Sequence, residues 1–281
     1  MIEIEEMVDI FIYRPIAFLL VKAVFNTRIT PDNLTSGAIV AGISAGVLYA
    51  FGTPHTRISG SILFVMFIIL DCSDGQLARL KKNGTPIGRL LDGIADYIVV
   101  TSVYIGIVIG YSNSEGQPTF MIAFLVLSAI SIIIQEVLVD FYRTRFADIV
   151  LDKKDTFAEG VDEYRKEYKM LKWRRGTFFK KSVIFLYLIY SGVQERITPR
   201  KVNQRSVTVS SREYYNKNKL LVRSWVFIGP SAARTTLVLC LFLNRLEIFF
   251  WVIIGLFNLL AISLFLVQKL VDRSYNHGKA V

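Results

Sequence analysis

The sequence has few of the residues from which disulfide frameworks and His-rich metal sites are built. Its 281 residues include two cysteines, Cys72 and Cys240, and two histidines, His55 and His277. Two cysteines cannot form a disulfide framework, and two histidines cannot supply a His-rich metal site. Any chemistry therefore has to use carboxylates, basic groups and hydroxyls.

Long apolar runs, in contrast, are abundant. Hydrophobic residues make up 53% of the chain and the mean hydropathy is +0.44, more than a soluble domain of this size requires. A bilayer core is crossed by about 20 mostly apolar helical residues, and six segments approach that length. The predicted spans are Leu34–Phe51, Ile58–Leu80, Pro86–Tyr111, Thr119–Tyr142, Leu220–Asn244 and Leu246–Val271. The sequence predicts an all-α integral membrane protein with six transmembrane helices.

The basic residues indicate how these spans are oriented. Three short links, 52–57, 112–118 and 244–245, together hold two of the 33 Lys and Arg residues. Because short cytoplasmic loops are enriched in Lys and Arg, the opposite ends of the spans should face the cytoplasm. Both termini and a long insert at 143–219 are therefore predicted to be cytoplasmic.

Two segments outside the spans are expected to lie against the membrane. Residues 1–29 mix apolar and charged residues around Pro15, which favours an interfacial helix over a seventh span. The acidic start of this segment is unlike a cleaved secretory signal, so we expect it to be retained.

The insert at 143–219 is the more basic of the two segments. It belongs to a stretch, 143–223, with 20 Lys and Arg against nine Asp and Glu, which favours a helical insert lying on anionic lipid head groups. Nucleic-acid binding is disfavoured because this surface would adjoin the membrane. The whole chain, 1–281, is predicted to form one membrane domain.

Four aspartates lie inside the second and third predicted spans. Asp71 and Asp74 share one helical face, and Asp92 and Asp96 share a face of the next helix. Ionisable groups within spans are costly and usually functional. Converging carboxylates need cations, and an all-oxygen ligand set suits Mg²⁺, Mn²⁺ or Ca²⁺ rather than Zn²⁺. Two divalent ions would balance the four charges.

Small residues accompany these aspartates. Gly75, Ala78 and Gly88 leave room for a ligand beside the backbone, and the alternative interpretation, close helix packing, is compatible with this one. Arg79, one turn beyond Gly75, could help to bind a phosphate or could be an anchor at a cytoplasmic helix end.

The spacing of these residues resembles a known family. The eight positions of the CDP-alcohol phosphotransferase (CDP-alcohol phosphatidyltransferase) signature are matched in register by Asp71, Asp74, Gly75, Ala78, Arg79, Gly88, Asp92 and Asp96. The stretch from Thr30 to Thr35 resembles the family's lead-in, except that Asp32 stands where Asn is usual. The six spans and the interfacial first helix are also similar to the family.

This resemblance implies a metal-dependent enzyme of phospholipid biosynthesis. Such an enzyme transfers a phosphate-linked alcohol, usually a lipid, from a CDP-linked donor to an alcohol acceptor and releases CMP. Asp71, Asp74 and Asp92, with help from Asp96, would hold two Mg²⁺ or Mn²⁺ ions, and Asp96 would also accept the acceptor's proton. The nucleotide would be bordered by Asp71, Asp74, Gly75, Ala78, Arg79 and Gly88. A cytoplasmic active site is expected, and homodimers occur among relatives.

The acceptor is indicated only by arginines. Arg234, inside the fifth predicted span, either pairs with an acid such as Glu136 or Asp140 or binds an anionic group of the acceptor. Arg143 and Arg145 could join it or serve as topology anchors. Three arginines at one cavity would favour a polyol phosphate, such as inositol phosphate or glycerol phosphate, because guanidinium pairs bidentately with phosphate.

Two other functions compete with this interpretation. A membrane prenyltransferase also uses aspartate-rich motifs and Mg²⁺, but would not require Gly75, Ala78, Arg79 and Gly88 at these spacings. A divalent-cation transporter should show polar groups continuing to the outer face, whereas 62–70 and 99–109 are nearly unbroken apolar runs. Both remain less favoured alternatives.

Overall fold

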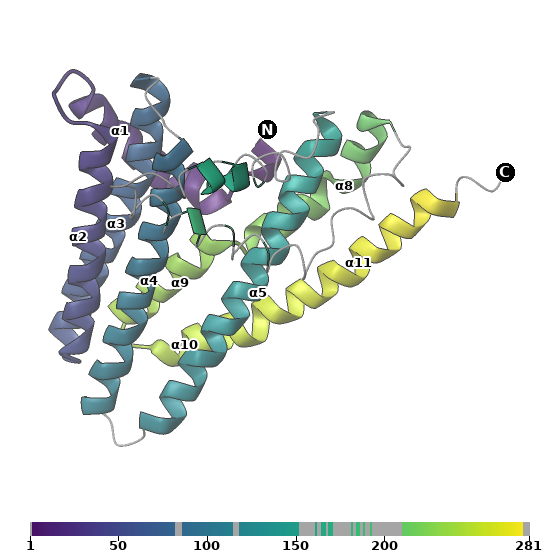
Figure 1. Ribbon diagram of the computed structural model, residues 1–281. Coiled ribbons are helices and arrows are strands. Elements are labelled where there is room, and N and C mark those ends of the chain that lie inside the picture. The colour runs from purple at the N-terminus through teal and green to yellow at the C-terminus, as the bar shows by residue number, and fades with distance from the viewer. Residues whose placement is uncertain are drawn as a thin grey trace. The chain divides into compact units, whose positions relative to one another are not determined.

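Every regular element in the described part of the chain is a helix (Figure 1). The computed structural model describes residues 2–81, 86–114, 118–151 and 210–277, together with isolated residues between 161 and 192. Short 3₁₀ (η1) or π-helical (η2, η4) turns accompany the α-helices. The elements are η1 (Ile2–Ile4), η2 (Asp9–Tyr13), α1 (Arg14–Val24), α2 (Pro31–Ala50), α3 (Pro54–Lys81), α4 (Pro86–Ser114), α5 (Pro118–Val150), α8 (Ser211–Phe227), α9 (Pro230–Phe242), α10 (Leu246–Phe250), η4 (Trp251–Phe257) and α11 (Asn258–His277).

Six helical segments are long and apolar enough to cross a membrane, which confirms the predicted all-α, six-span class. The fourth predicted span, Thr119–Tyr142, lies within α5, which continues to Val150 and so into the predicted helical insert. Its last turns bury Phe146 and so keep a packed apolar face beyond the predicted end. Arg143 and Arg145 therefore lie within a helix, and most of the remaining insert lies outside the described residues.

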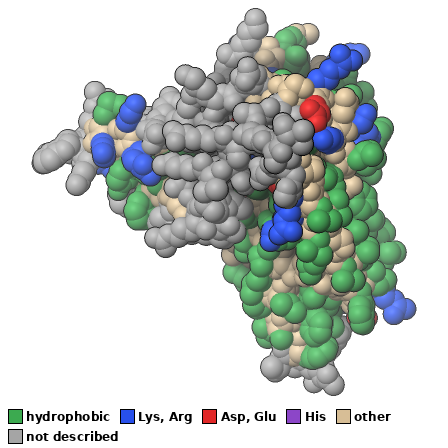
Figure 2. Space-filling model, turned by 90° about the vertical axis from the view of Figure 1, so that its right-hand side faces the viewer, with side chains coloured by type: hydrophobic (Ala, Val, Ile, Leu, Met, Phe, Trp, Pro, Cys, Tyr) green, Lys and Arg blue, Asp and Glu red, His purple; other side chains and the backbone are tan. Residues whose placement is uncertain are grey.

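The surface of the described helices is suited to lipid. Large apolar side chains such as Val40, Trp251 and Leu266 are more than half exposed. Figure 2 shows hydrophobic side chains over much of the described surface on one face of the molecule. Because a bilayer solvates such side chains, this exposure agrees with a membrane protein.

Local sequence signals determine where several helices begin. Proline occupies the first position of α2, α3, α4, α5 and α9, where its missing N–H costs no hydrogen bond. Thr30 caps α2 and Ser210 caps α8, each accepting a hydrogen bond from the backbone N–H three residues later. The turn 228–230 separates α8 from α9 and contains Gly229, and Pro230 begins the second helix.

The predicted interfacial segment is broken into several turns. The described residues from 2 to 29 form η1, η2 and α1, and α1 ends at Val24. Ala17 and Val21, one turn apart on α1, are buried, while Phe18 and Leu19 are more than half exposed. This amphipathic pattern is compatible with a membrane interface, and the interfacial location stays a prediction.

The chain divides into two compact units, which are described separately. The aspartate unit comprises Glu6–Ile133 and Pro230–Phe257, and the α11 unit comprises Met1–Glu5, Ile134–Gly229 and Asn258–Val281.

In the aspartate unit, α2 packs against α3 and α4, and the three helices lie side by side in Figure 1. Glycines allow α2 and α4 to touch through their backbones. A Cβ at Gly106 would lie 2.0 Å from the Gly46 carbonyl oxygen, and a Cβ at Gly42 would lie 2.3 Å from a methyl group of Val99. Such contacts hold membrane helices together where lipid removes the hydrophobic driving force.

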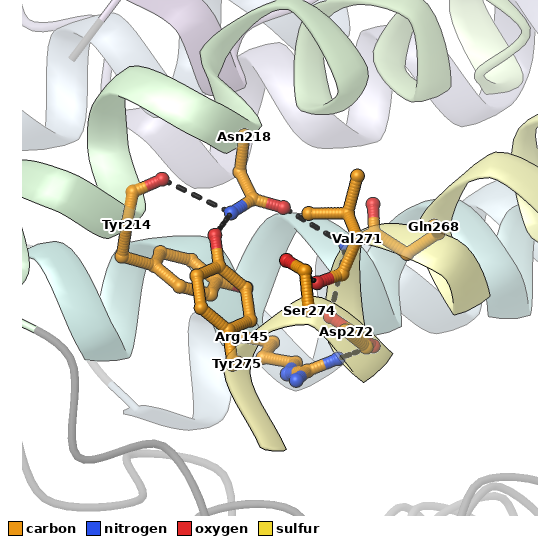
Figure 3. A network of polar contacts seen from close by, with 8 residues as sticks. All are labelled: Arg145, Tyr214, Asn218, Gln268, Val271, Asp272, Ser274 and Tyr275. Atoms are coloured by element: carbon orange, nitrogen blue, oxygen red, sulfur yellow. Dashed lines mark hydrogen bonds and ion pairs between the residues drawn. The ribbon is translucent and has the colours of Figure 1, made fainter. Parts of the chain in front are cut away.

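The α11 unit contains a buried polar network that joins α5, α8 and α11 (Figure 3). Arg145 Nη1 lies 2.7 Å from Asp272 Oδ2. Gln268 Nε2 donates to Asn218 Oδ1 at 2.9 Å and to Asp272 Oδ1 at 3.3 Å. Asn218 Nδ2 donates in turn to the Tyr275 hydroxyl at 2.7 Å. In this network, buried polar groups on three helices are hydrogen-bonded to one another.

The glycine contact gives a first prediction. Gly106→Ala should lower the unfolding free energy in detergent by about 1–3 kcal/mol, because the new methyl group overlaps the Gly46 carbonyl of α2. Gly37→Ala is the matched control on α2, since its Cβ would meet Leu70 Cδ1 at an ordinary 3.7 Å. Equal unfolding midpoints for the two variants would contradict the close contact.

A second prediction concerns the Arg145–Asp272 pair, whose side chains are 8% and 28% exposed. Asp272→Ala should destabilise the protein by up to ~3–5 kcal/mol, because it leaves a buried guanidinium without its counterion. Adding Arg145→Met should restore part of the loss by removing the unpaired charge. Thermal unfolding is the measurement, with Glu213→Ala, which breaks an exposed pair with Lys217, as control. A double variant less stable than Asp272→Ala would contradict this role.

Candidate active site

Helix α3 carries the first aspartate pair in its final turns. Asp71 is partly exposed, whereas Asp74 is only 5% exposed. Positions three apart on a helix project from one face, so the predicted spacing of the two carboxylates is realised on a continuous helix. The apolar residues that precede them make up the membrane-spanning part of α3.

Asp74 is held by a hydroxyl group from the first turn of α2. Thr35 Oγ1 donates a hydrogen bond to Asp74 Oδ2. The turn is itself fixed by Thr30, whose side chain accepts from the Asn33 N–H at 3.3 Å. The resemblance to the family includes the lead-in from Thr30 to Thr35 but implies no role for Thr35. Asp32, the departure from the family pattern, lies exposed in this first turn, where the positive end of the helix dipole favours an acid.

The start of α2 is also anchored to the end of α3. Val21, Leu34 and Leu77 form a buried apolar cluster that joins α1, α2 and α3. Beside it, Lys81 Nζ donates to the Ile29 carbonyl oxygen at 2.8 Å. These contacts hold the Thr35 hydroxyl group at the Asp74 carboxylate.

Asp96 on α4 pairs with Arg234 on α9. Arg234 Nη2 lies 2.7 Å from Asp96 Oδ2, and the two side chains are 27% (Asp96) and 19% (Arg234) exposed. The other carboxylate oxygen, Asp96 Oδ1, is buried and has no hydrogen-bond partner among the described residues. A buried acceptor of this kind usually has a partner, so Oδ1 is suited to receive a proton or to face a cation.

This pair answers one question that the sequence left open. Glu136 and Asp140 were the suggested partners of Arg234, and the structure pairs it with Asp96, an acid that had been considered only as base and ligand. Arg145 bonds Asp272 in the α11 unit, and Arg143 is exposed there. A shared acceptor site for the three arginines stays a prediction.

The small residues of the motif leave space at the surface of α3. A Cβ added to Gly75 would meet no described atom closer than Arg79 Nη1, at 3.8 Å. Arg79 is exposed and lies one turn after Gly75, so its guanidinium group borders this open side of the helix. Ala78 is partly exposed on the next turn. The arrangement suits a ligand that approaches the backbone.

The remaining motif residues are described only as backbone. Gly88 and Asp92 lie in α4, the latter one turn before Asp96, and their side chains fall outside the described residues. Among the side chains that are described, no three His, Cys, Asp or Glu residues form a cluster that could hold a metal ion. The four-aspartate metal set, which includes Asp92, therefore stays a prediction.

The chemical type of the described donors, as distinct from their grouping, suits a hard divalent cation. Asp71, Asp74 and Asp96 offer carboxylate oxygens, which Mg²⁺ and Mn²⁺ prefer. Asp96 Oδ1, which has no hydrogen-bond partner among the described residues, adds a further acceptor. One carboxylate oxygen of Asp74 accepts the hydrogen bond from Thr35, so the orientation of the carboxylate is set before any ligand binds.

Comparisons with known proteins bear on the family of the chain. The family described as CDP-alcohol phosphatidyltransferase matches residues 28–192. A phosphatidylinositol phosphate synthase of Mycobacteroides abscessus is 30% identical over 126 residues, 45% of this chain and 54% of that protein. A protein of the same name from Mycolicibacterium smegmatis is 29% identical over 114 residues, 40% of this chain and 48% of that protein.

A third relative carries a different name. A CDP-diacylglycerol–glycerol-3-phosphate 3-phosphatidyltransferase of Rickettsia bellii is 36% identical over 75 residues, 27% of this chain and 41% of that protein. The chain thus spans about half the length of the curated relatives it matches. No solved structure matches it. Because the family match covers more than half of the 281 residues, including all eight motif positions, the chain belongs to the CDP-alcohol phosphatidyltransferase family.

Proposed function

We propose that the protein transfers a phosphatidyl group from a CDP-linked lipid to the hydroxyl group of an acceptor and releases CMP. Family membership supports the reaction class, and it leaves the prenyltransferase and transporter interpretations without support. The observation that carries the proposal is the environment of the Asp96 carboxylate. One of its oxygens pairs with Arg234, and the other is buried and has no partner among the described residues.

Asp96 is the proposed general base. Its Oδ1 takes the proton of the acceptor hydroxyl, whose oxygen then bonds to the phosphorus that carries the lipid alcohol. The bond from that phosphorus to the bridging oxygen breaks, and CMP leaves with this oxygen. A carboxylate within hydrogen-bond reach of the hydroxyl typically contributes about 10²–10⁴-fold to such a step.

The other motif residues orient the donor. Asp71, Asp74 and Asp92, together with Asp96, would hold Mg²⁺ or Mn²⁺, with two ions balancing the four carboxylates. When bound, such ions neutralise the diphosphate and stabilise the leaving phosphate. Thr35 holds Asp74 in place, and the space beside Gly75, bordered by Arg79, takes the nucleotide. Gly88 and Ala78 complete the proposed nucleotide site.

Arg234 is the proposed acceptor residue, and the acceptor is a polyol phosphate such as inositol phosphate or glycerol phosphate. The guanidinium group already binds one carboxylate oxygen of Asp96, and a phosphate could bind it through two oxygens. An acceptor phosphate at Arg234 would bring the acceptor beside Asp96. The names of the Mycobacteroides and Rickettsia relatives, which refer to phosphatidylinositol phosphate and glycerol-3-phosphate, support this acceptor class.

The proposed site faces the cytoplasm. The links predicted to be external hold two of the 33 Lys and Arg residues. Asp71 and Asp74 lie near the end of α3 that is remote from one of these links, at residues 52–57. The homodimer that the resemblance implies stays a prediction.

The first functional prediction concerns the base and the metal. Release of labelled CMP from CDP-diacylglycerol should require Mg²⁺ or Mn²⁺ and stop on chelation. Asp96→Asn should lower kcat by about 100-fold or more, because the amide cannot take the acceptor's proton. Asp32→Asn, an exposed position where the family usually has Asn, should retain activity as the matched control. CMP release that survives both chelation and Asp96→Asn would refute the proposal.

The second functional prediction concerns the acceptor. Arg234→Ala should raise the KM for a polyol phosphate by at least about tenfold, since hydrogen bonds to charged groups contribute ~1.5–3 kcal/mol. The KM for the CDP-linked donor should change much less. Arg245→Ala, an exposed arginine before α10, is the control. Steady-state kinetics with several acceptors measure the effect, and equal changes in both KM values would overturn the assignment.

A further inference from the structure

The start of α9 requires support from outside the helix. Because α9 follows the turn at 228–230, no preceding helical turn accepts hydrogen bonds from its first N–H groups. Arg234 lies in the second turn of α9, so movement of this helix start displaces its guanidinium group.

A carboxylate from the N-terminal segment caps this helix start. Glu6 Oε2 accepts a hydrogen bond from the Ser231 N–H at 2.7 Å, and Glu6 is only 7% exposed. Burial and the nearby Asp9 raise the pKa of Glu6 to about 7, while the bonds from Ser231 and the charge of Arg234 act in the opposite direction. An acid at a helix N-terminus is favourable both as a cap and through the helix dipole.

A second contact joins the same segment to α9 beside Arg234. The Tyr13 hydroxyl lies 2.8 Å from Thr235 Oγ1, and Tyr13 is 3% exposed. Thr235 Oγ1 already donates to the Ser231 carbonyl oxygen at 2.6 Å. Because a hydroxyl has one proton to donate, Tyr13 is the donor in its bond to Thr235. Glu6 and Tyr13 therefore contact α9 on either side of Arg234 in the sequence.

A third contact joins the N-terminal segment to α3. Gln76 Nε2 of α3, two residues after Asp74, donates to the Arg14 carbonyl oxygen at 3.2 Å. Residues 6–14, here called the N-terminal strap, are thus bonded both to the helix that carries Asp71 and Asp74 and to the helix that carries Arg234. All three contacts lie within the aspartate unit.

We propose that the N-terminal strap sets the position of α9 relative to α3, and that Glu6 and Tyr13 are positioning residues for Arg234 at the acceptor subsite. This inference rests on the proposed function of Arg234. Glu6 supports the first turn of α9, and Tyr13 fixes the next turn at Thr235. Together they hold the guanidinium group at Asp96, where the acceptor's phosphate is proposed to bind.

Steady-state kinetics test whether the N-terminal strap acts through Arg234. Glu6→Ala should raise the acceptor KM by about tenfold, as expected for a lost helix cap, and leave the donor KM within about twofold. Glu6→Gln keeps a hydrogen-bond acceptor for Ser231 and should restore most of the affinity. In the Arg234→Ala background, Glu6→Ala should add less than about twofold, since residues that act through one another are not additive. Additive effects would overturn the inference.

Matched controls separate positioning from general damage. Thr235→Val and Thr236→Val both remove a hydroxyl that bonds the carbonyl oxygen four residues earlier, but Thr235 alone also bonds Tyr13. Thr235→Val and Tyr13→Phe should therefore raise the acceptor KM, and Thr236→Val should not. Glu3→Ala removes an acid of the N-terminal segment that bonds Tyr215 of α8, and should also leave the acceptor KM unchanged. Equal effects of Thr235→Val and Thr236→Val would count against the strap.

A measurement without turnover separates this inference from the proposed function. The coupling between Arg234 and Asp96 can be obtained from unfolding midpoints of Arg234→Ala, Asp96→Ala and the double variant. This coupling should fall by about half or more in the Glu6→Ala background. An unchanged coupling overturns the strap, whatever the activity. A reduced coupling in a protein that releases no CMP with any acceptor supports the positioning of Arg234 and refutes the proposed function instead.

Discussion

The ion pair between Arg234 and Asp96 is the interaction on which the site depends. It places opposite charges on α9 and α4 within a bundle whose outer side chains are apolar. Breaking a partly buried pair is costly because the remaining charge keeps part of its desolvation penalty, so each residue restricts where the other can lie. The pair joins the proposed base to the proposed acceptor residue, and an anionic acceptor has to compete with Asp96 for the guanidinium group.

Helix α2 carries no proposed catalytic residue, yet it positions carboxylates on both of its neighbours. Its first turn supplies Thr35, which bonds Asp74 on α3. Two to three turns later, Gly42 and Gly46 allow α4 to approach so closely that Val99, three residues after Asp96, touches the α2 surface. A backbone contact of this kind leaves little freedom to slide, because any larger residue would separate the helices. Small residues in α2 therefore help to position acidic residues that belong to the neighbouring helices.

Much of the fold could be predicted because its signals are local. Apolar runs of membrane length, prolines at helix starts and Thr or Ser caps act within one element. The motif on α3 and α4 could be predicted for the same reason, since helical periodicity decides which positions share a face. Helix α5 continues eight residues beyond the predicted span, as far as Val150, because a helix that leaves the bilayer can continue while it still has a packed face. The partner of Arg234, the role of Thr35 and the cap by Glu6 were not predicted, because those contacts join positions 138, 39 and 225 residues apart.

The sequence by itself determined that the protein is suited to a membrane, how many spans it has and how its aspartates are spaced along two helices. These properties follow from the hydropathy of segments and from the helical repeat, neither of which requires knowledge of another segment. Only the tertiary structure decided that Asp74 bonds Thr35, that Asp96 bonds Arg234 and that Glu6 caps α9. A polar group inside an apolar bundle bonds to whichever partner the packed helices bring within reach, and that choice depends on how the helices pack.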